Sequence, residues 1–146
     1  MDLHLRQVFF TPDGWPVVSP ERYTGSVSRK FSAEDMAGEW EVIRIQEPAY
    51  ERRLQAGQIL WGEGQLKEEE WNVSHLLSLE KNGHLGENKG TWELLEAKQL
   101  LSLTLEGEII NNLIIFAGHD WENEKETVLF TGLDSCGRSI WGKRIK

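Results

Sequence analysis

The sequence predicts an all-β fold: an antiparallel β-barrel of about eight strands, preceded by a β-hairpin and a short helical turn. Three observations lead to it. Apolar segments bounded by turn residues recur at roughly ten-residue intervals along the 146-residue chain. Asn82-Gly83 is a strong hairpin signal. The segment 101–105 alternates leucine with Ser102 and Thr104, which is typical of a half-buried strand, and no 3.6-residue period is sustained elsewhere.

The N-terminal residues predict a hairpin. Residues 3–10 are rich in apolar side chains and end at Thr11-Pro12-Asp13-Gly14. Proline presets φ and glycine tolerates the reversal, so this tetrapeptide is a turn. Residues 15–19 then form a short strand, which Pro16 confines to an edge or an end.

A short helix follows an exposed connector at residues 25–30. Ser32 precedes it as the N-cap, and Asp35 stands three residues later, as in a capping box. Gly38 ends this segment, so we expect only one or two helical turns.

The remainder of the chain predicts the barrel strands. Closing such strands into a barrel removes the exposed edges that an open sheet would have. Residues 50–56 are compatible with a short helix or a long loop. The predicted strands are residues 39–46, 58–67, 71–81, 90–95, 100–106, 108–117, 127–133 and 138–145.

A change in composition predicts two parts. The first 35 residues hold three of the four prolines and five acids against four bases, whereas the rest holds 19 acids against 12 bases. We expect a boundary near residues 26–32, which separates an N-terminal hairpin and linker (1–30) from the barrel (31–146).

Two Gly-x-Trp sequences suggest how the barrel is built. Gly38-Glu39-Trp40 opens the first barrel strand, and Gly90-Thr91-Trp92 repeats the spacing. Glycine lets backbone pass close beneath an indole that closes the barrel end, as in lipocalin-like barrels. Together with the apolar strand 108–117, this leaves an alternative function open: a calycin-like barrel that binds a small apolar ligand.

Charge and hydropathy exclude several partners. The 24 acids against 16 bases give a net charge of −8, which disfavours nucleic acid and anionic membranes as partners. The longest apolar run, residues 113–117, is far below the roughly 20 residues of a membrane-spanning helix. The first residues lack a signal-peptide core, and localisation is not determined by this chain.

The sequence predicts no catalytic residue, no metal site and no cofactor. Cys136 has no histidine near it in sequence, and the chain contains no HxH, HExxH or CxxC spacing and no phosphate-binding glycine loop. A glycosidase needs two carboxylates flanking one bond. The acids here cluster in predicted turns and outward positions, which is typical of a solvated surface: Glu68, Glu69, Glu70, Glu106, Glu108, Glu122, Glu124 and Glu126.

The seven tryptophans are the best candidates for binding. An exposed indole stacks on the apolar face of a sugar ring. Trp61, Trp71 and Trp121 border polar or turn-like stretches, and we expect them to be the carbohydrate-binding residues. Trp40, Trp92 and Trp141 lie within strand patterns, where core packing is expected.

Two stretches carry a family resemblance. LHLRQVFFTPDGWPVVSPERY (residues 3–23) resembles a run in bacterial endo-1,5-α-L-arabinanases of glycoside hydrolase family 43. The tail, from Asp120-Trp121-Glu122-Asn123 to Ile140-Trp141-Gly142-Lys143, resembles the end of the extra C-terminal domain of these enzymes.

The resemblance implies a non-catalytic C-terminal accessory domain with a structural and carbohydrate-binding role. In that family a β-propeller carries the catalytic carboxylates, the run at residues 3–23 closes the propeller, and a lipocalin-like barrel follows. The chain begins at the closing run, so no catalytic residue can be assigned in it, and Glu21 receives no role. The implied partners are arabinan, a plant polysaccharide, or an N-terminal propeller domain, and the implied location is extracellular.

Overall fold

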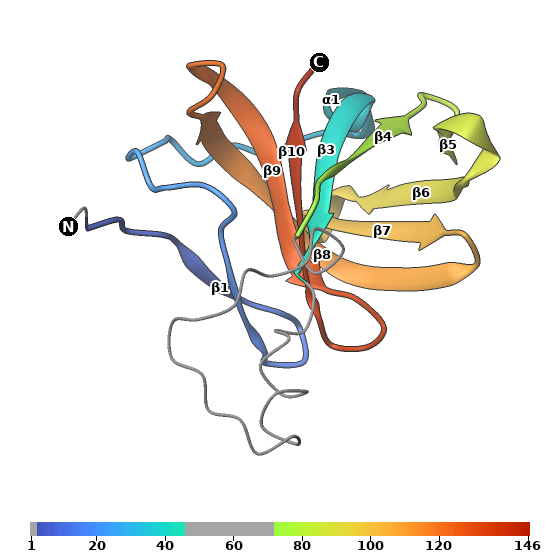
Figure 1. Cartoon of the computed structure of the whole chain (residues 1–146), viewed down its shortest axis with the longest axis horizontal. Helices are drawn as coiled ribbons and strands as arrows, with labels where there is room; N and C mark the ends of the chain where they lie inside the picture. The colour runs from blue at the N-terminus through green and yellow to red at the C-terminus, as the bar shows by residue number, and fades with distance from the viewer. Residues whose placement is uncertain (1–2, 46–71) are drawn as a thin grey trace, which may run out of the picture.

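The computed structural model describes residues 3–45 and 72–146 (Figure 1). These residues form a closed antiparallel barrel of eight strands and a separate two-stranded sheet, with very little helix. The hairpin lies beside the barrel and takes no part in its wall (Figure 1). The predicted fold class is therefore confirmed.

All pairings between neighbouring barrel strands are antiparallel. The strands of the barrel neighbour one another in the order β10-β3-β4-β5-β6-β7-β8-β9, and β9 pairs with β10 to close it. The elements are β1 (Val8–Phe10), β2 (Pro16–Val18), α1 (Ala33–Met36), β3 (Gly38–Arg44), β4 (His75–Leu79), β5 (His84–Leu85), η2 (Gly86–Asn88), β6 (Gly90–Leu95), η3 (Glu96–Lys98), β7 (Leu100–Leu105), β8 (Glu108–Asp120), β9 (Lys125–Leu133) and β10 (Ser139–Arg144).

Most of the strands predicted within the described residues match observed ones. The strand predicted at 58–67 lies outside the described residues, and so does the segment 50–56. The two-residue strand β5 was not predicted, because the Asn82-Gly83 turn leads into a pairing of only Leu79 with Leu85. Strand β8 continues to Asp120, beyond the predicted end at 117, because His119 and Asp120 pair with Glu126 and Lys125 of β9.

Helix α1 begins as the sequence predicts. The Ser32 hydroxyl accepts from the Asp35 backbone N–H, and the Asp35 carboxylate accepts from the Ser32 N–H at 2.8 Å, completing a capping box. Gln99, at the turn before β7, bonds to both the N–H and the carbonyl of Phe31, at 2.7 and 2.9 Å. The helix is thereby fixed against the end of the barrel.

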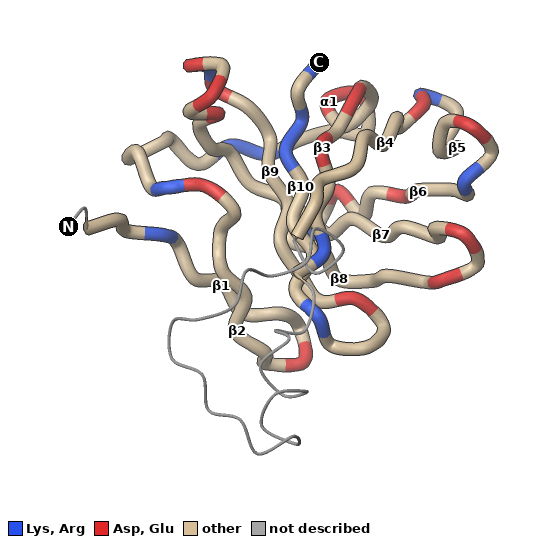
Figure 2. Tube along the Cα trace, viewed as in Figure 1, with Lys and Arg blue, Asp and Glu red and all other residues tan. Residues whose placement is uncertain are grey.

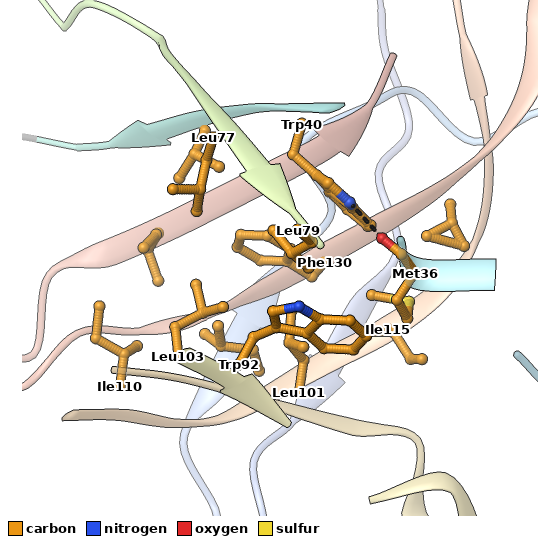
Figure 3. Close-up of a cluster of buried hydrophobic side chains, with 14 of the residues drawn as sticks. Met36, Trp40, Leu77, Leu79, Trp92, Leu101, Leu103, Ile110, Ile115 and Phe130 are labelled. Atoms are coloured by element: carbon orange, nitrogen blue, oxygen red, sulfur yellow. Dashed lines mark hydrogen bonds between the residues drawn. The ribbon is translucent and has the colours of Figure 1, made fainter. Parts of the chain in front are cut away.

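Both Gly-x-Trp sequences place glycine where no side chain fits. Gly38 and Gly90 have φ of +142° and +146°, and a Cβ there would collide with the carbonyls of Lys146 and Thr104. The tryptophan two residues later is buried in each case. Trp40 donates its indole N–H to the Met36 carbonyl at 2.8 Å, so it links the barrel to the helix that covers its end (Figure 3).

The core fills the inside of the barrel (Figure 3). Along β7, Leu101 and Leu103 are fully buried, as the alternating pattern predicts. The Trp40 and Phe130 rings lie 5.4 Å apart at the centre. Gly142 gives Phe130 its space, since a Cβ at that position would overlap the ring.

Candidate functional site

The centre of the barrel is filled by the protein's own side chains. Trp40, Phe130, Leu101, Leu103 and Leu113 have no exposed surface and pack together there. A ligand carrier needs an open, largely apolar pocket of several hundred Å³. The calycin-like ligand carrier is therefore not favoured, and the outside of the barrel is the better place for a site.

The β1–β2 hairpin is apolar on both faces. Its inner residues pack on the barrel: Val17 is 3% exposed, and the Phe9 ring lies 4.4 Å from the ring of Phe116 on β8. Its outer residues Val8 and Phe10 are 55% and 69% exposed. A strand that faces water on one side alternates apolar and polar residues, whereas a strand covered on both sides is continuously apolar.

The exposed apolar surface continues beyond the two strands. Leu3, Leu5, Trp15 and Tyr23 lie outside the strands and are exposed, as is Val18 at the end of β2, and all lie in the N-terminal 23 residues. We call this set, with Val8 and Phe10, the hairpin face. Single apolar residues on a surface are ordinary, whereas seven large ones exposed within 23 residues are many for one segment.

A hydrogen bond fastens the hairpin to the barrel, and another shapes the N-terminal segment itself. The Thr131 hydroxyl on β9 donates to the Val18 carbonyl at 2.6 Å. Arg6 donates to the Ser19 carbonyl at 3.0 Å, and its guanidinium lies 5.7 Å from the centre of the Trp141 ring. The hairpin is thus held against the barrel, with Val8 and Phe10 exposed on its outer side.

Lys143 on β10 provides a second anchor. Its ammonium lies 3.1 Å from Asp120, 2.9 Å from Glu122 and 3.3 Å from Glu21, which belongs to the N-terminal segment. Glu41 is 3.8 Å away. The Lys143 side chain is only 10% exposed and the Asp120 side chain is fully buried, so water screens this ion pair poorly.

The surroundings of this ion pair favour the charged form of both partners. Burial alone would lower the pKa of Lys143, but hydrogen bonds to Glu122 and Asp120 outweigh it and raise that pKa well above its usual value. Burial alone would raise the pKa of Asp120, but hydrogen bonds from Asn123 and Lys143 bring it below its usual range. The anchor is therefore charged across the neutral pH range.

The second fully buried carboxylate, Asp134, is also paired. It accepts from the Arg138 guanidinium at 2.9 Å and lies 3.4 Å from Arg44. Both buried carboxylates hold turns and cations in place and have no open side toward a substrate. The other acids gather largely in loops, including the β7–β8 and β8–β9 turns (Figure 2).

The three tryptophans predicted to bind carbohydrate are not brought together among the described residues. Trp61 and Trp71 lie outside them. Trp121 is 41% exposed, with the Arg22 guanidinium 4.3 Å from its ring centre and the His119 ring edge-on at 4.9 Å. One side of this indole is therefore occupied by an arginine from the N-terminal segment.

The expectation that Trp141 belongs to the core is wrong. Trp40 and Trp92 are buried, but Trp141 is half-buried on the outer wall. Ile140 and Gly142 face the core, so the alternation of the strand turns Trp141 outward. Sequence pattern could not assign its side, because β10 carries apolar residues at both parities.

The described residues were searched for metal-binding groups and for membrane-spanning helices. Residues 3–45 and 72–146 contain no group of three or more His, Cys, Asp or Glu side chains placed to hold a metal ion. Within the same ranges, no helix has the length and apolar character needed to cross a membrane. Cys136 is exposed and unpaired with another cysteine.

Sequence reasoning missed the Lys143 anchor. Lys143 and Glu21 are 122 positions apart, and neither motif nor spacing connects them. The sequence held only a weak signal: an aspartate ends the apolar strand β8, and a lysine lies within β10, where a charge must find a partner if buried.

Comparison with known proteins places the chain in a family. Residues 20–142 match GH43_C, a C-terminal lipocalin-like domain. Two curated relatives are the extracellular endo-α-(1→5)-L-arabinanase 2 of Bacillus subtilis, 26% identical, and an extracellular endo-α-(1→5)-L-arabinanase of Thermotoga petrophila, 28% identical. The alignments cover 98% and 99% of this chain but only 26% and 27% of those proteins, so the chain spans about a quarter of their length.

Solved structures share the fold. A family 43 glycoside hydrolase of Bacillus licheniformis, the YxiA protein, superposes with a TM-score of 0.71 at 23% identity, covering 98% of this chain and 28% of that one. The Thermotoga petrophila endo-1,5-α-L-arabinanase gives 0.67 at 22% identity, with 98% and 29% covered. With the family match over most of its length, the chain belongs to the GH43_C family of C-terminal lipocalin-like domains.

Proposed function

We propose that this chain is a non-catalytic accessory domain that docks onto the catalytic domain of an arabinan-degrading glycosidase through the hairpin face. One observation carries the proposal: β1 and β2 are apolar on both faces, and the barrel covers only one of them. This chain matches only about a quarter of each relative, and the remaining length is ample for a domain that would cover the other face.

We assign separate roles to the hairpin and to the barrel, because the hairpin is covered by the barrel on one face only. The N-terminal part (1–30) acts as the docking element, and the barrel strands of the C-terminal part (31–146) hold it. The fastening by Thr131 and Lys143 supports this role, because a docking surface binds more tightly when its shape is set beforehand. The chain itself hydrolyses no glycan, and the complete protein acts outside the cell, as the names of its relatives suggest.

A carbohydrate contact by Trp61, Trp71 and Trp121 remains part of the proposal. Trp121 is the one with a described environment. Its exposed indole could stack on a sugar ring on the side that Arg22 leaves open.

Calorimetry tests the docking. The partner is the catalytic portion of the Bacillus subtilis arabinanase without the segment that matches this chain. We expect saturable binding that Phe10→Asp weakens at least tenfold, because a carboxylate would have to be desolvated in an apolar contact. Leu95→Asp, at an exposed leucine on β6, is the control and should bind like the unchanged chain. The proposal is contradicted if the unchanged chain does not bind the catalytic portion. It is also contradicted if Phe10→Asp and Leu95→Asp lose the same amount of affinity.

A further inference from the structure

A hollow of about 230 Å³ lies where the N-terminal segment meets the outer wall of the barrel. Its walls come from three parts of the chain: the residues after β2, the outward side of β3 and β10, and the residues just before β4. The lining includes Pro20, Glu21, Glu41, Ile43, Ser74 and Trp141. Trp121, the one tryptophan expected to bind carbohydrate that lies among the described residues, is not part of its lining.

We propose that this hollow binds one sugar residue of a neutral polysaccharide. Its apolar wall is the first reason. Trp141 and Ile43 pair across β10 and β3, so indole and aliphatic side chain lie next to each other on the same outer surface. A sugar ring presents a C–H face that packs on an indole, while its hydroxyls require polar partners at the rim.

The polar groups of the hollow are fixed in place before any ligand arrives. Glu41 accepts a hydrogen bond from the Ser74 hydroxyl at 2.6 Å, and Glu21 accepts one from Lys143 at 3.3 Å. A carboxylate has about four lone-pair sites, so each retains acceptor capacity for sugar hydroxyls. Acceptors positioned in advance lower the entropy cost of binding.

The charge of the hollow selects the class of sugar. Glu21, Glu41 and Lys143 line the hollow, and Asp120 and Glu122 pair with Lys143 beside it. A second nearby cation is Arg6, 5.7 Å from the centre of the Trp141 ring, so these four carboxylates stand against two cations. The surplus of negative charge repels anionic ligands, so uronic acids and phosphates are disfavoured. The assignment to a neutral glycan rests on the hollow itself, and the choice of arabinan among neutral glycans rests on the proposed function.

The experiment is a calorimetric and NMR titration of the full 146-residue chain with separate oligosaccharides of arabinose, xylose, glucose (cellulose type) and galacturonic acid. We expect saturable binding of the arabinose oligomers and at least tenfold weaker binding of the galacturonate oligomers. Trp141→Ala should weaken arabinose binding about tenfold, which corresponds to about 1.4 kcal/mol. Thermal unfolding of the variant establishes that it is folded.

Two further variants locate the site. Glu41→Gln keeps a similar shape and removes one charge, so it should weaken arabinose binding and reduce the discrimination against galacturonate. Leu95→Ala on the opposite side of the barrel is the control, and its affinity should equal that of the unchanged chain. Trp121→Ala distinguishes the two candidate indoles. If Trp121→Ala loses affinity for the arabinose oligomers and Trp141→Ala keeps it, the hollow is not the site.

The remaining outcomes are also decisive. Absence of binding by every neutral oligomer overturns the sugar site, and equal binding of galacturonate overturns the selection by charge. Binding of xylose or glucose oligomers without arabinose oligomers overturns the assignment to arabinan. A chain that docks onto the catalytic portion but binds no sugar refutes this inference alone, whereas sugar binding without docking refutes the accessory role alone.

Discussion

Lys143 on the last strand of the barrel holds Glu21 of the N-terminal segment at 3.3 Å across 122 positions of sequence. The same ammonium binds the buried Asp120 at 3.1 Å. One side chain therefore connects the β8–β9 end of the barrel with the residues that follow the hairpin. This arrangement makes the position of the hairpin face depend on a partly buried charge.

Replacing Lys143 with methionine should destabilise the chain strongly. The Asp120 carboxylate would stay buried without its cation, and breaking a buried pair in this way costs about 3–5 kcal/mol. Urea unfolding followed by circular dichroism measures the loss. Lys98→Met, at an exposed lysine, is the control and should change the free energy of unfolding by less than about 0.5 kcal/mol. A Lys143→Met variant as stable as the control would refute the anchor.

The anchor also predicts a pH profile. The pKa of Asp120 is lowered on folding, so its contribution is present above its ordinary value of 3.8 and is lost as pH falls further. The pKa of Lys143 is raised on folding, so its contribution is complete below its ordinary value of 10.5 and is lost at higher pH. Unfolding free energies measured from about pH 2 to pH 11 should be flatter at both ends in the double variant Asp120→Asn, Lys143→Met. Equal curvature in both proteins would contradict this.

Glycine substitutions should separate backbone strain from lack of space. Gly107 has φ of +85° with open space where a Cβ would project, so Gly107→Ala should cost only about 1–2 kcal/mol of left-handed strain. Gly90 has φ of +146° and faces the Thr104 carbonyl, so Gly90→Ala adds a collision to the strain. We expect Gly90→Ala to lower the melting temperature much further than Gly107→Ala. Similar melting temperatures would contradict the close approach described for the Gly-x-Trp sequences.

Truncating Phe9 should loosen the hairpin more than the barrel. Its ring packs 4.4 Å from Phe116 on the outer wall, so Phe9→Ala removes an aromatic contact of the inner hairpin surface. Hydrogen exchange should accelerate at Ser19 and Tyr23, whose N–H groups bond across the hairpin to Gln7 and Leu5. Exchange in β6 and β7 should be unchanged. Equal acceleration in all these elements would mean that the hairpin is part of one cooperative unit.

The sequence predicted most of the fold because strands, turns and helix caps each depend on residues that are close together in the chain. The alternation in β7, the turn at Asn82-Gly83 and the capping box at Ser32 all depend on residues within a few positions of each other. The extent of β8 depended on its partner strand β9, so the prediction ended three residues early.

The site was harder to predict because its parts come from distant positions. The hollow beside Trp141 joins the residues after β2 to β3, β10 and the approach to β4, and strand pattern alone could not turn that indole outward. The continuously apolar runs in β1 and β2 were visible in the sequence, but their meaning required the structure, which covers one face and leaves the other exposed.

Hydroxyl-radical footprinting of the chain, alone and with the catalytic portion of the Bacillus subtilis arabinanase, tests the accessory role most directly. We expect Phe10, Trp15 and Tyr23 to become protected when the catalytic portion is added, while Leu95 on the far side of the barrel reacts as before. Unchanged reactivity of the hairpin face, or protection centred on Leu95, would contradict the accessory role.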